Sequence, residues 1–353
     1  MTIDPFYLKQ CSKMAHFIGG SPDWVQGGGG NFSIKIDHHR MLIKASGLCL
    51  KEVNVSRGVV LVDYLKVKKY FNSFFDKKIT VQIENFSNKA IFNFTSNFLS
   101  NKKLKASIEV GFHVFLKKYV IHSHSVYANL LNCSANSEKL LKKIFNGINV
   151  EYVVVNYGAP GLSLAKEMLI SINKHIKNGN NWPEVIFLKN HGIVINTEDF
   201  DRCFSIYLKV DELIKRYFKI RSIYPSVSIK KYSNEFLSNT IFLKKYLFGT
   251  ILNNKLFEPI LFPDQVVYLN KKIVDDKVFL NLGDKLSINK NTKKIFYHTN
   301  QKESLAIEET MAAYFYIKKN IKRLKLKLKK ISNIDIDFIN KMESEKYRKL
   351  RLK

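Results

Sequence analysis

Cysteine is scarce in this sequence of 353 residues, and its four copies lie far apart along the chain. Such spacing fits reduced thiols better than a disulfide framework or a cysteine-rich zinc site. None of the thiols is a strong candidate for a catalytic nucleophile. The four residues are Cys11, Cys49, Cys133 and Cys203.

Long apolar runs are also missing. No stretch approaches the roughly 18 apolar residues that mark a membrane-spanning helix. The sequence opens with Met1-Thr2-Ile3-Asp4-Pro5, which has neither the basic flank nor the small-residue cleavage site of a secretory signal. We therefore expect a cytoplasmic protein without a membrane partner.

Acidic residues are few. The chain has 30 Asp and Glu residues and 58 Lys and Arg residues, which give a formal net charge of +28. A strong positive field can mark a nucleic-acid-binding protein. Here the lysines are spread over the whole chain together with many Asn, Ile and Phe residues, which indicates compositional bias. We expect no nucleic-acid partner, whereas the same field would attract small phosphorylated substrates.

Four of the glycines form one run, Gly27-Gly28-Gly29-Gly30, that leads into a predicted β-hairpin over residues 31–44. A second loop, Ser46-Gly47, follows the hairpin, and antiparallel pairing brings both loops to the same end. Backbone N–H groups and hydroxyls in such loops can hold a phosphate, with Lys35 or Lys44 adding charge. A glycine run can also serve only to turn the chain. Neither the dinucleotide nor the P-loop fingerprint is present.

Two histidines, His122 and His124, end an apolar stretch with Ser123 between them. A strand sends alternate side chains to one face, so both imidazoles would project together. Neutral imidazole is a common zinc ligand, and a catalytic zinc uses three protein ligands and one open position. The third candidate is His191, because its place before Gly192 at a strand break lets the ring face a cleft. A turn histidine bonded to nearby backbone is the other interpretation.

Glu109 lies at the start of segment 106–116, whose pattern predicts a helix with Ser107 as its N-cap. This helix leads into the strand that carries His122, so the carboxylate is near enough to share a site with it. A carboxylate in the first turn also complements the helix dipole. The sequence leaves both roles open.

Predicted strands and helices alternate over the first two-thirds of the chain, and the hairpin favours antiparallel pairing. We predict an α/β fold with α+β character, in which a central, mostly antiparallel sheet is covered by helices. A boundary near Tyr224-Pro225-Ser226 would separate a domain over residues 1–224 from a C-terminal α/β extension over residues 225–353.

The extension has a simple predicted pattern. The sequence predicts a turn and strand over residues 263–268, further strands over 277–281 and 294–297, and a helix over 304–330. We find no cluster of chemically active groups in this region, and His298 is solitary.

Six short motifs occur in a fixed order along the chain, and together they resemble the class II aldolase and adducin superfamily. Zinc enzymes of this superfamily cleave or isomerise ketose phosphates. The resemblance covers residues from about Asp4 to Tyr224, and the segment around Pro263-Asp264 looks more like the longer, rhamnulose-phosphate-aldolase-like branch. The motifs are Gly29-Gly30-Asn31-Phe32-Ser33, Lys44-Ala45-Ser46-Gly47, Ser107-Ile108-Glu109-Val110-Gly111-Phe112-His113, His122-Ser123-His124, Tyr157-Gly158-Ala159-Pro160-Gly161 and Leu188-Lys189-Asn190-His191-Gly192.

The resemblance implies a role for each candidate residue. His122, His124 and His191 would bind one Zn²⁺ per chain, and Glu109 would be the catalytic acid or base. Ile108 stands where the short-chain fuculose-phosphate aldolases carry a second serine, so one phosphate contact is lost or supplied by a lysine. The implied phosphate or hydroxyl contacts are Gly30, Asn31, Ser33, Ser46, Gly47 and Ser107.

The implied activity is that of a zinc-dependent aldolase, an aldehyde-lyase. It would cleave or form a carbon–carbon bond in a phosphorylated ketose, with dihydroxyacetone phosphate and an aldehyde as the two halves. Zinc would stabilise the negative charge that develops beside the ketone. Sugar-phosphate 4-epimerases and dehydratases share the scaffold, and adducin is a non-catalytic binding protein, so the reaction stays open. The resemblance also implies a homo-oligomer, commonly a tetramer.

Overall fold

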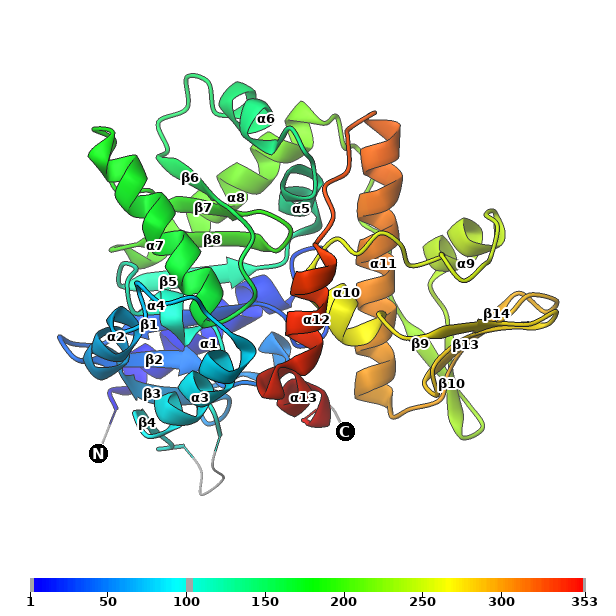
Figure 1. Ribbon diagram of the computed structural model, residues 1–353, viewed down its shortest axis with the longest axis horizontal. Coiled ribbons are helices and arrows are strands. Elements are labelled where there is room, and N and C mark those ends of the chain that lie inside the picture. Colours follow the sequence, from blue (N-terminus) through cyan, green and yellow to red (C-terminus); the bar gives the residue numbers. More distant parts are fainter. Residues whose placement is uncertain (1–2, 100–103, 352–353) are drawn as a thin grey trace.

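The computed structural model describes residues 3–99 and 104–351. This part of the chain forms two β-sheets, one of eight strands and one of six. Figure 1 shows the long helix α11 (Gln301–Arg323) standing between the two sheets. No helix within the described ranges combines the length and the apolarity of a bilayer-spanning segment.

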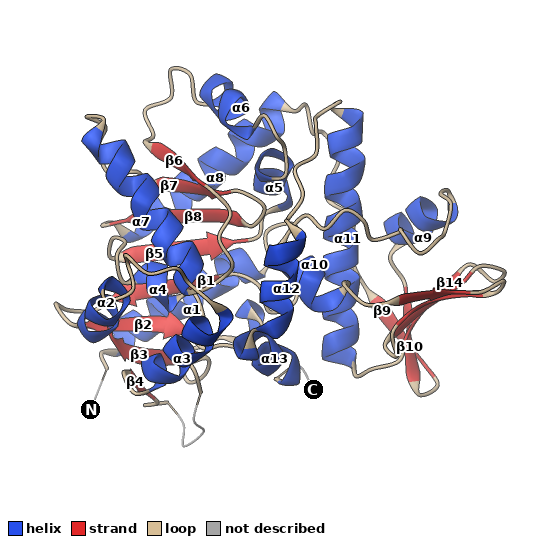
Figure 2. Cartoon of the chain, in the orientation of Figure 1, coloured by secondary structure: helices blue, strands red, loops and turns tan. Residues whose placement is uncertain are grey.

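The eight-stranded sheet carries the candidate site. Its strands are β1 (Asn31–Lys35), β2 (Arg40–Lys44), β3 (Val59–Asp63), β4 (Thr95–Ser96), β5 (Tyr119–Ser123), β6 (Tyr152–Val155), β7 (Val185–Leu188) and β8 (Gly192–Thr197). Their order in space is β4-β3-β2-β1-β5-β8-β7-β6, as the red strands of Figure 2 show. Every neighbouring pair is antiparallel except β6 with β7. The predicted fold class is confirmed, and β5 lies at the centre of the sheet.

Helices cover both faces of this sheet. Along β2, Met41 and Ile43 belong to one buried cluster and Leu42 to the other, because successive side chains of a strand point to opposite faces. Helices α1, α5, α6 and α8 contribute to the cluster of Leu42, and α2, α3, α4 and α7 to that of Met41. The helices are α1 (Pro5–Gly19), α2 (Tyr64–Asn72), α3 (Val81–Phe92), α4 (Val110–His113), α5 (Val126–Asn132), α6 (Ser137–Ile144), α7 (Leu162–Lys177) and α8 (Phe200–Tyr217), with a 3₁₀ turn at Leu50–Glu52.

The predicted helix over residues 106–116 is much shorter in the structure, where α4 spans only four residues. The residues before it run alongside the end of β2 instead: Ala106 forms a bridge with Ala45, and the Ser107 amide donates to the Lys44 carbonyl at 3.1 Å. Pairing with the sheet therefore replaces the first helical turn. This pairing brings Ser107 directly beside the Ser-Gly loop.

The six-stranded sheet is antiparallel throughout and belongs to the C-terminal extension. Its strands are β9 (Ile229–Tyr232), β10 (Glu235–Ser238), β11 (Ile273–Asp275), β12 (Phe279–Leu282), β13 (Leu286–Asn289) and β14 (Lys294–Tyr297), in the spatial order β11-β12-β13-β14-β10-β9. The remaining helices are α9 (Ile241–Phe248), α10 (Pro263–Tyr268), α12 (Asn333–Lys341) and α13 (Glu343–Leu350).

The turn and strand predicted over residues 263–268 are wrong, because this segment is helix α10. Pro263 occupies the first helical turn, where its missing N–H is not needed. All six residues of α10 are buried, and the helix packs against α11 and α12. Tertiary packing thus overrides the β-propensity of Val266 and Val267.

The extension shares its core with the first part of the chain. Tyr127 on α5 and Tyr316 on α11 belong to one buried cluster, and their ring centroids are 6.1 Å apart. The change from the first sheet to the second falls between α8 and β9, close to the boundary that the sequence suggests. The division into two domains at residue 224 stays a prediction.

Candidate functional site

The end of the central strand β5 positions two of the three candidate ligands: His122 lies on the strand, and His124 directly follows its last residue. His122 and His124 point to the same side of the chain, and their Nε2 atoms are 3.2 Å apart. Ser123, between them, points to the other face, where its hydroxyl lies 2.7 Å from that of Tyr207 on α8. In the ladder with β1, His122 stands directly opposite Asn31. The pairing of these strands therefore sets the position of the His122 imidazole.

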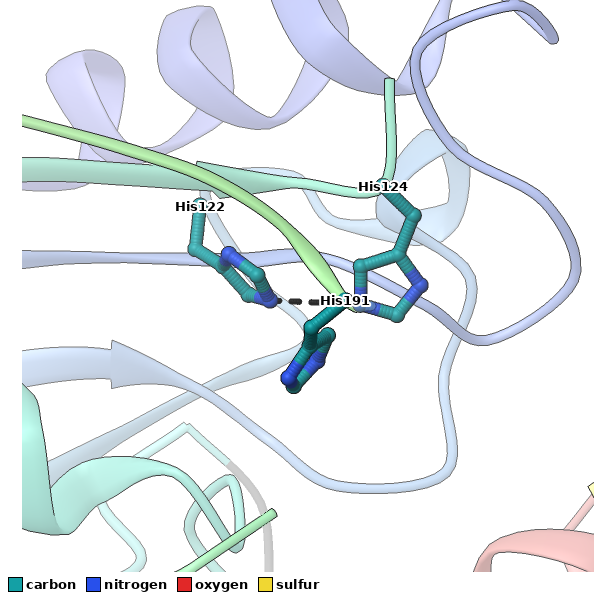
Figure 3. Close-up of side chains that lie close together, drawn as sticks. All are labelled: His122, His124 and His191. Atoms are coloured by element: carbon teal, nitrogen blue, oxygen red, sulfur yellow. Dashed lines mark hydrogen bonds between the residues drawn. The ribbon is translucent and has the colours of Figure 1, made fainter. Parts of the chain in front are cut away.

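His191 reaches the same place from the turn between β7 and β8. Asn190 reverses the chain there with a left-handed φ of +56°. A Cβ on the following residue, Gly192, would lie 2.2 Å from the Ser123 carbonyl oxygen, so only glycine lets β8 approach β5 this closely. The His191 ring centroid is 5.0 Å from those of both His122 and His124, and Figure 3 shows the three rings converging.

Hydrogen bonds on the outer nitrogens orient two of these rings. Nδ1 of His122 lies 3.0 Å from the Ile193 carbonyl oxygen and therefore carries the proton, which leaves Nε2 as the lone-pair nitrogen. Nδ1 of His124 is bonded in the same way to a carboxylate oxygen of Asp264. Partners of this kind fix the tautomer that a metal ligand needs.

Burial and charge act differently on the three imidazoles. Burial lowers the pKa of His122, and it lowers that of His191 well below its ordinary value. Burial alone would also lower the pKa of His124, but the Asp264 carboxylate outweighs it and raises that pKa. His122 and His191 are therefore neutral near pH 7, which is the form that binds metal.

The donor set fits a divalent transition metal. All three histidines are buried, and their ligand atoms lie within 4.8 Å of one another. The Nε2 atoms of His122 and His124 face each other at 3.2 Å. Two lone pairs at this distance repel each other unless a proton or a cation lies between them. A carboxylate oxygen of Glu109, Oε1, is buried beside them without a hydrogen-bond partner in the described part of the chain. A cation among these atoms would satisfy all of them.

Glu109 stands at the N-terminal end of α4 and faces the histidines. Its carboxylate oxygens lie 3.3 Å from Nε2 of His122 and 3.2 Å from Nε2 of His191. The side-chain amide of Asn31 donates to its Oε2 at 2.7 Å. The same amide also donates to Ser107 Oγ at 3.1 Å. The carboxylate is therefore held against the imidazoles of His122 and His191.

Behind Asn31 lies His113, a residue whose role sequence reasoning missed. Its Nε2 is bonded to the carbonyl oxygen of the Asn31 side chain, and its Nδ1 lies 2.7 Å from the Ser33 hydroxyl. Burial lowers the pKa of His113 well below its ordinary value, so this ring is neutral. Ser33 and His113 thus orient the amide that in turn holds Glu109. The only signal in the sequence was the position of His113 four residues after Glu109.

A cavity opens beside the histidines, and most of the predicted contact residues lie around it. Gly30, Asn31, Lys44, Ser46, Gly47 and Ser107 all line it, together with Glu109, His124 and His191. Two predicted residues do not. Ser33 is bonded to His113, and Lys35 binds the Leu116 carbonyl and lies over the Tyr64 ring, away from the cavity.

The C-terminal extension contributes to this site, which corrects the expectation that it holds no chemically active group. Pro263, Glu345 and Arg348 line the cavity. Asp264 accepts a hydrogen bond from Arg348 Nη2 at 2.7 Å while its other oxygen binds His124. Burial alone would raise the pKa of Asp264, but His124 and Arg348 hold it well below its usual range. Asp264 is therefore ionised and joins the extension to the histidine cluster.

The chain has recognisable relatives. Residues 14–218, more than half of the chain, match the family model of the class II aldolase and adducin N-terminal domain. No curated protein matches the sequence. Similar solved structures include the N-terminal class II aldolase domain of a conserved protein from Thermoplasma acidophilum, with 19% identity over 62% of this chain and 96% of that chain and a TM-score of 0.48. A sugar-phosphate aldolase from Thermotoga maritima has 15% identity over 61% and 96%, with a TM-score of 0.42. L-fuculose 1-phosphate aldolase from Glaciozyma antarctica has 13% identity over 61% and 75%, with a TM-score of 0.38.

Proposed function

Because the chain belongs to the class II aldolase and adducin family, we propose that it is a zinc-dependent aldolase. The reaction breaks or forms a carbon–carbon bond in a phosphorylated ketose, with dihydroxyacetone phosphate and an aldehyde as the two halves. The observation that supports this proposal best is the convergence of three buried histidines and Glu109 beside a cavity that Lys44 lines.

His122, His124 and His191 would hold the metal. When bound there, zinc acts as a Lewis acid that stabilises negative charge developing on a substrate oxygen. The histidines are neutral ligands, so they leave the ion its full positive charge, and a set of three leaves one coordination position for substrate. The bonds from His122 to Ile193 and from His124 to Asp264 keep both rings in the required tautomer.

Glu109 would transfer the proton that cleavage, or its reversal, requires. The Asn31 amide holds one carboxylate oxygen and leaves Oε1 directed at the histidines. Glu109 is 6% exposed, so little water competes for the proton. Positioned general acid–base catalysis of this kind typically contributes about 10²–10⁴-fold to the rate.

The two loops at the end of the hairpin would bind the phosphorylated end of the substrate. The hydroxyls of Ser46 and Ser107 and the backbone of Gly30 and Gly47 line the cavity there. Lys44 supplies positive charge at the same place, since it is 2% exposed and lines the cavity as well. A lysine in this position would compensate for Ile108, which has no hydroxyl.

We also propose a division into residues 1–224 and 225–353, one zinc ion per chain, a cytoplasmic location and a homo-oligomer, with a tetramer as the form usual in the family. Elemental analysis of the purified protein measures the number of zinc ions per chain. Light scattering during size-exclusion chromatography measures the number of subunits.

A panel of ketose 1-phosphates and 5-phosphates tests the proposed reaction. We expect the zinc-loaded protein to release dihydroxyacetone phosphate from at least one of them, and the Glu109→Gln variant to release far less. Glu212→Gln, at an exposed position on α8, is the matched control and should behave as the wild type. Formation of an epimer without dihydroxyacetone phosphate would replace the aldolase by an epimerase. Zinc binding without turnover of any substrate would favour a non-catalytic role of the adducin kind.

A further inference from the structure

The last helix of the described chain, α13, lies over the cavity beside the histidines. Glu345 and Arg348 on this helix are part of the cavity wall, and Figure 1 shows α13 in red between the first sheet and α11. The turn after the helix packs on the Ser-Gly loop, because a Cβ on Gly47 would lie 2.5 Å from the Cβ of Arg351. The helix thus covers the place where the substrate phosphate would bind.

Arg348 is the residue of α13 that binds Asp264. Its side chain is only 10% exposed, and Nη2 donates to Asp264 Oδ1 at 2.7 Å. Its Nε lies 2.9 Å from a carboxylate oxygen of Glu345, one turn earlier on the helix. A guanidinium has five N–H donors. Arg348 lines the cavity, and its guanidinium has more N–H groups than the two that face Asp264 and Glu345.

Lys44 is a second buried cation that lines the same cavity. Its ammonium has three donors, yet within residues 3–99 and 104–351 its hydrogen bond is a single long one, 3.3 Å to the Ala45 carbonyl. Burial lowers the pKa of Lys44 to about 8, and the nearby Arg348 charge acts in the same direction. A buried ammonium without a full set of acceptors indicates a site that an anion completes.

The cavity is too small for a ligand while α13 is in place. It leaves about 20 Å³, which is roughly the room for one water molecule. A phosphate group does not fit, so α13 has to move before a substrate enters. The contacts that hold the helix are mainly polar: Glu343 binds Asn85 and Lys89, and the Lys105 ammonium lies over the Tyr347 ring. Exposed contacts of this kind contribute little to stability. The main interaction that opening has to break is therefore the buried bond between Arg348 and Asp264.

We propose that Arg348 is a substrate-binding residue: α13 moves outward to admit the substrate and then rests against it, so that Arg348 and Lys44 hold its anionic group between them. The identity of that group as the phosphate of a sugar rests on the proposed function, whereas the case for an anion rests on the incomplete set of acceptors around Lys44 and on the N–H groups of Arg348 beyond those that face Asp264 and Glu345. The helix is accordingly a lid that carries part of the binding site with it.

Phosphate binding to the full-length protein tests this proposal without any turnover. The probe is inorganic phosphate, and the readout is its dissociation constant by isothermal titration calorimetry for the wild type and for Arg348→Gln. We expect the variant to bind about tenfold or more weakly, as for the loss of one charge-assisted contact. Lys346→Gln, at an exposed position on the same helix, removes the same charge and should bind within about twofold of the wild type.

Hydrogen exchange shows where the anion acts. Phosphate should slow exchange of the amides of residues 343–350 in the wild type and in Lys346→Gln, but not in Arg348→Gln. If Arg348→Gln lowers the thermal midpoint of unfolding, Arg348→Lys separates loss of binding from loss of stability. This variant keeps the charge, so its phosphate affinity should lie between those of the wild type and Arg348→Gln.

Equal phosphate affinity in the wild type and Arg348→Gln would overturn the proposal. So would phosphate binding that leaves exchange of α13 unchanged. Failure of the proposed function gives a different result. A protein that binds phosphate through Arg348 but converts no ketose phosphate would contradict the proposed aldolase activity and leave the proposed anion site supported.

Discussion

His124 and Asp264 are joined by a hydrogen bond between Nδ1 and a carboxylate oxygen, although 140 residues separate them in the sequence. Asp264 lies on α10, in the part of the chain beyond the residues that match the family model. It is fully buried and also binds Arg348. The C-terminal extension therefore supplies the group that orients one of the three candidate ligands.

Removing this carboxylate should weaken metal binding. In Asp264→Asn the ring of His124 loses its negatively charged partner, and changes of this kind typically lower metal affinity about 10–100-fold. A competition titration with a chromophoric chelator measures the zinc dissociation constant. Asp276→Asn, at an exposed position before β12, is the control and should leave the constant unchanged. Equal affinities in Asp264→Asn and wild type would show that Asp264 has no part in holding the metal.

The third ligand can be tested by deletion of its side chain. His191→Ala leaves two imidazoles, and we expect the zinc content to fall from about one ion per chain to nearly none, since a catalytic site needs three protein ligands. The fold should survive, because the turn is fixed by the backbone of Asn190 and Gly192. His16→Ala, at an exposed position on α1, should keep its zinc. Full zinc occupancy in His191→Ala would remove this residue from the site.

Glu109→Gln separates catalysis from metal binding. The amide is close in size to the carboxylate but cannot take up a proton, so turnover should fall about 10²–10⁴-fold. Zinc content, measured on the same sample, should stay at the wild-type level because the three histidines are intact. A variant that loses zinc along with turnover would instead make Glu109 a ligand, and unchanged turnover would leave it as a carboxylate at a helix start.

Glu84 should make stability depend on pH. Its carboxylate accepts hydrogen bonds from the Leu162 amide at the start of α7, and burial raises its pKa to about 7. The folded protein therefore holds a proton that the unfolded chain has released above about pH 4.5. The stability due to this group is fully present below that pH and is lost as the pH rises through 7.

Urea unfolding at pH 5 and pH 8 measures this effect. Between these values the free energy of unfolding of the wild type should fall by about 2 kcal/mol more than that of Glu84→Gln, which does not titrate. Glu212→Gln on α8 is the exposed control and should follow the wild type. The same pH dependence in wild type and Glu84→Gln would contradict the raised pKa.

Local patterns in the sequence predicted those parts of the site that lie on regular strands and tight turns. The period of two at the end of β5 brought His122 and the next residue but one, His124, to one side of the chain. The glycine after His191 indicated the turn that delivers the third ring. Hairpin pairing put the glycine loop and the Ser-Gly loop at one end. These features depend only on residues that are close in sequence or on one pair of strands. A pattern of a few residues is therefore enough to predict them.

The parts that were missed depend on tertiary packing. Asp264 was read as part of a turn and strand, because Val266 and Val267 favour β structure and nothing nearby shows that α11 and α12 bury the segment. Arg348 stands in a basic stretch and carries no motif. Ser33 was expected to contact substrate, but its hydroxyl faces His113, and only the arrangement of α4 behind β1 determines this.

The bond between His124 and Asp264 also has a consequence for the order of synthesis. A ribosome makes the three histidines long before it reaches α10, and domains generally fold as their residues emerge. A nascent chain can therefore assemble the eight-stranded sheet while His124 still lacks its carboxylate, and α13 comes later still. The carboxylate that orients His124 and the helix that covers the cavity thus reach their places only after the scaffold around them can form.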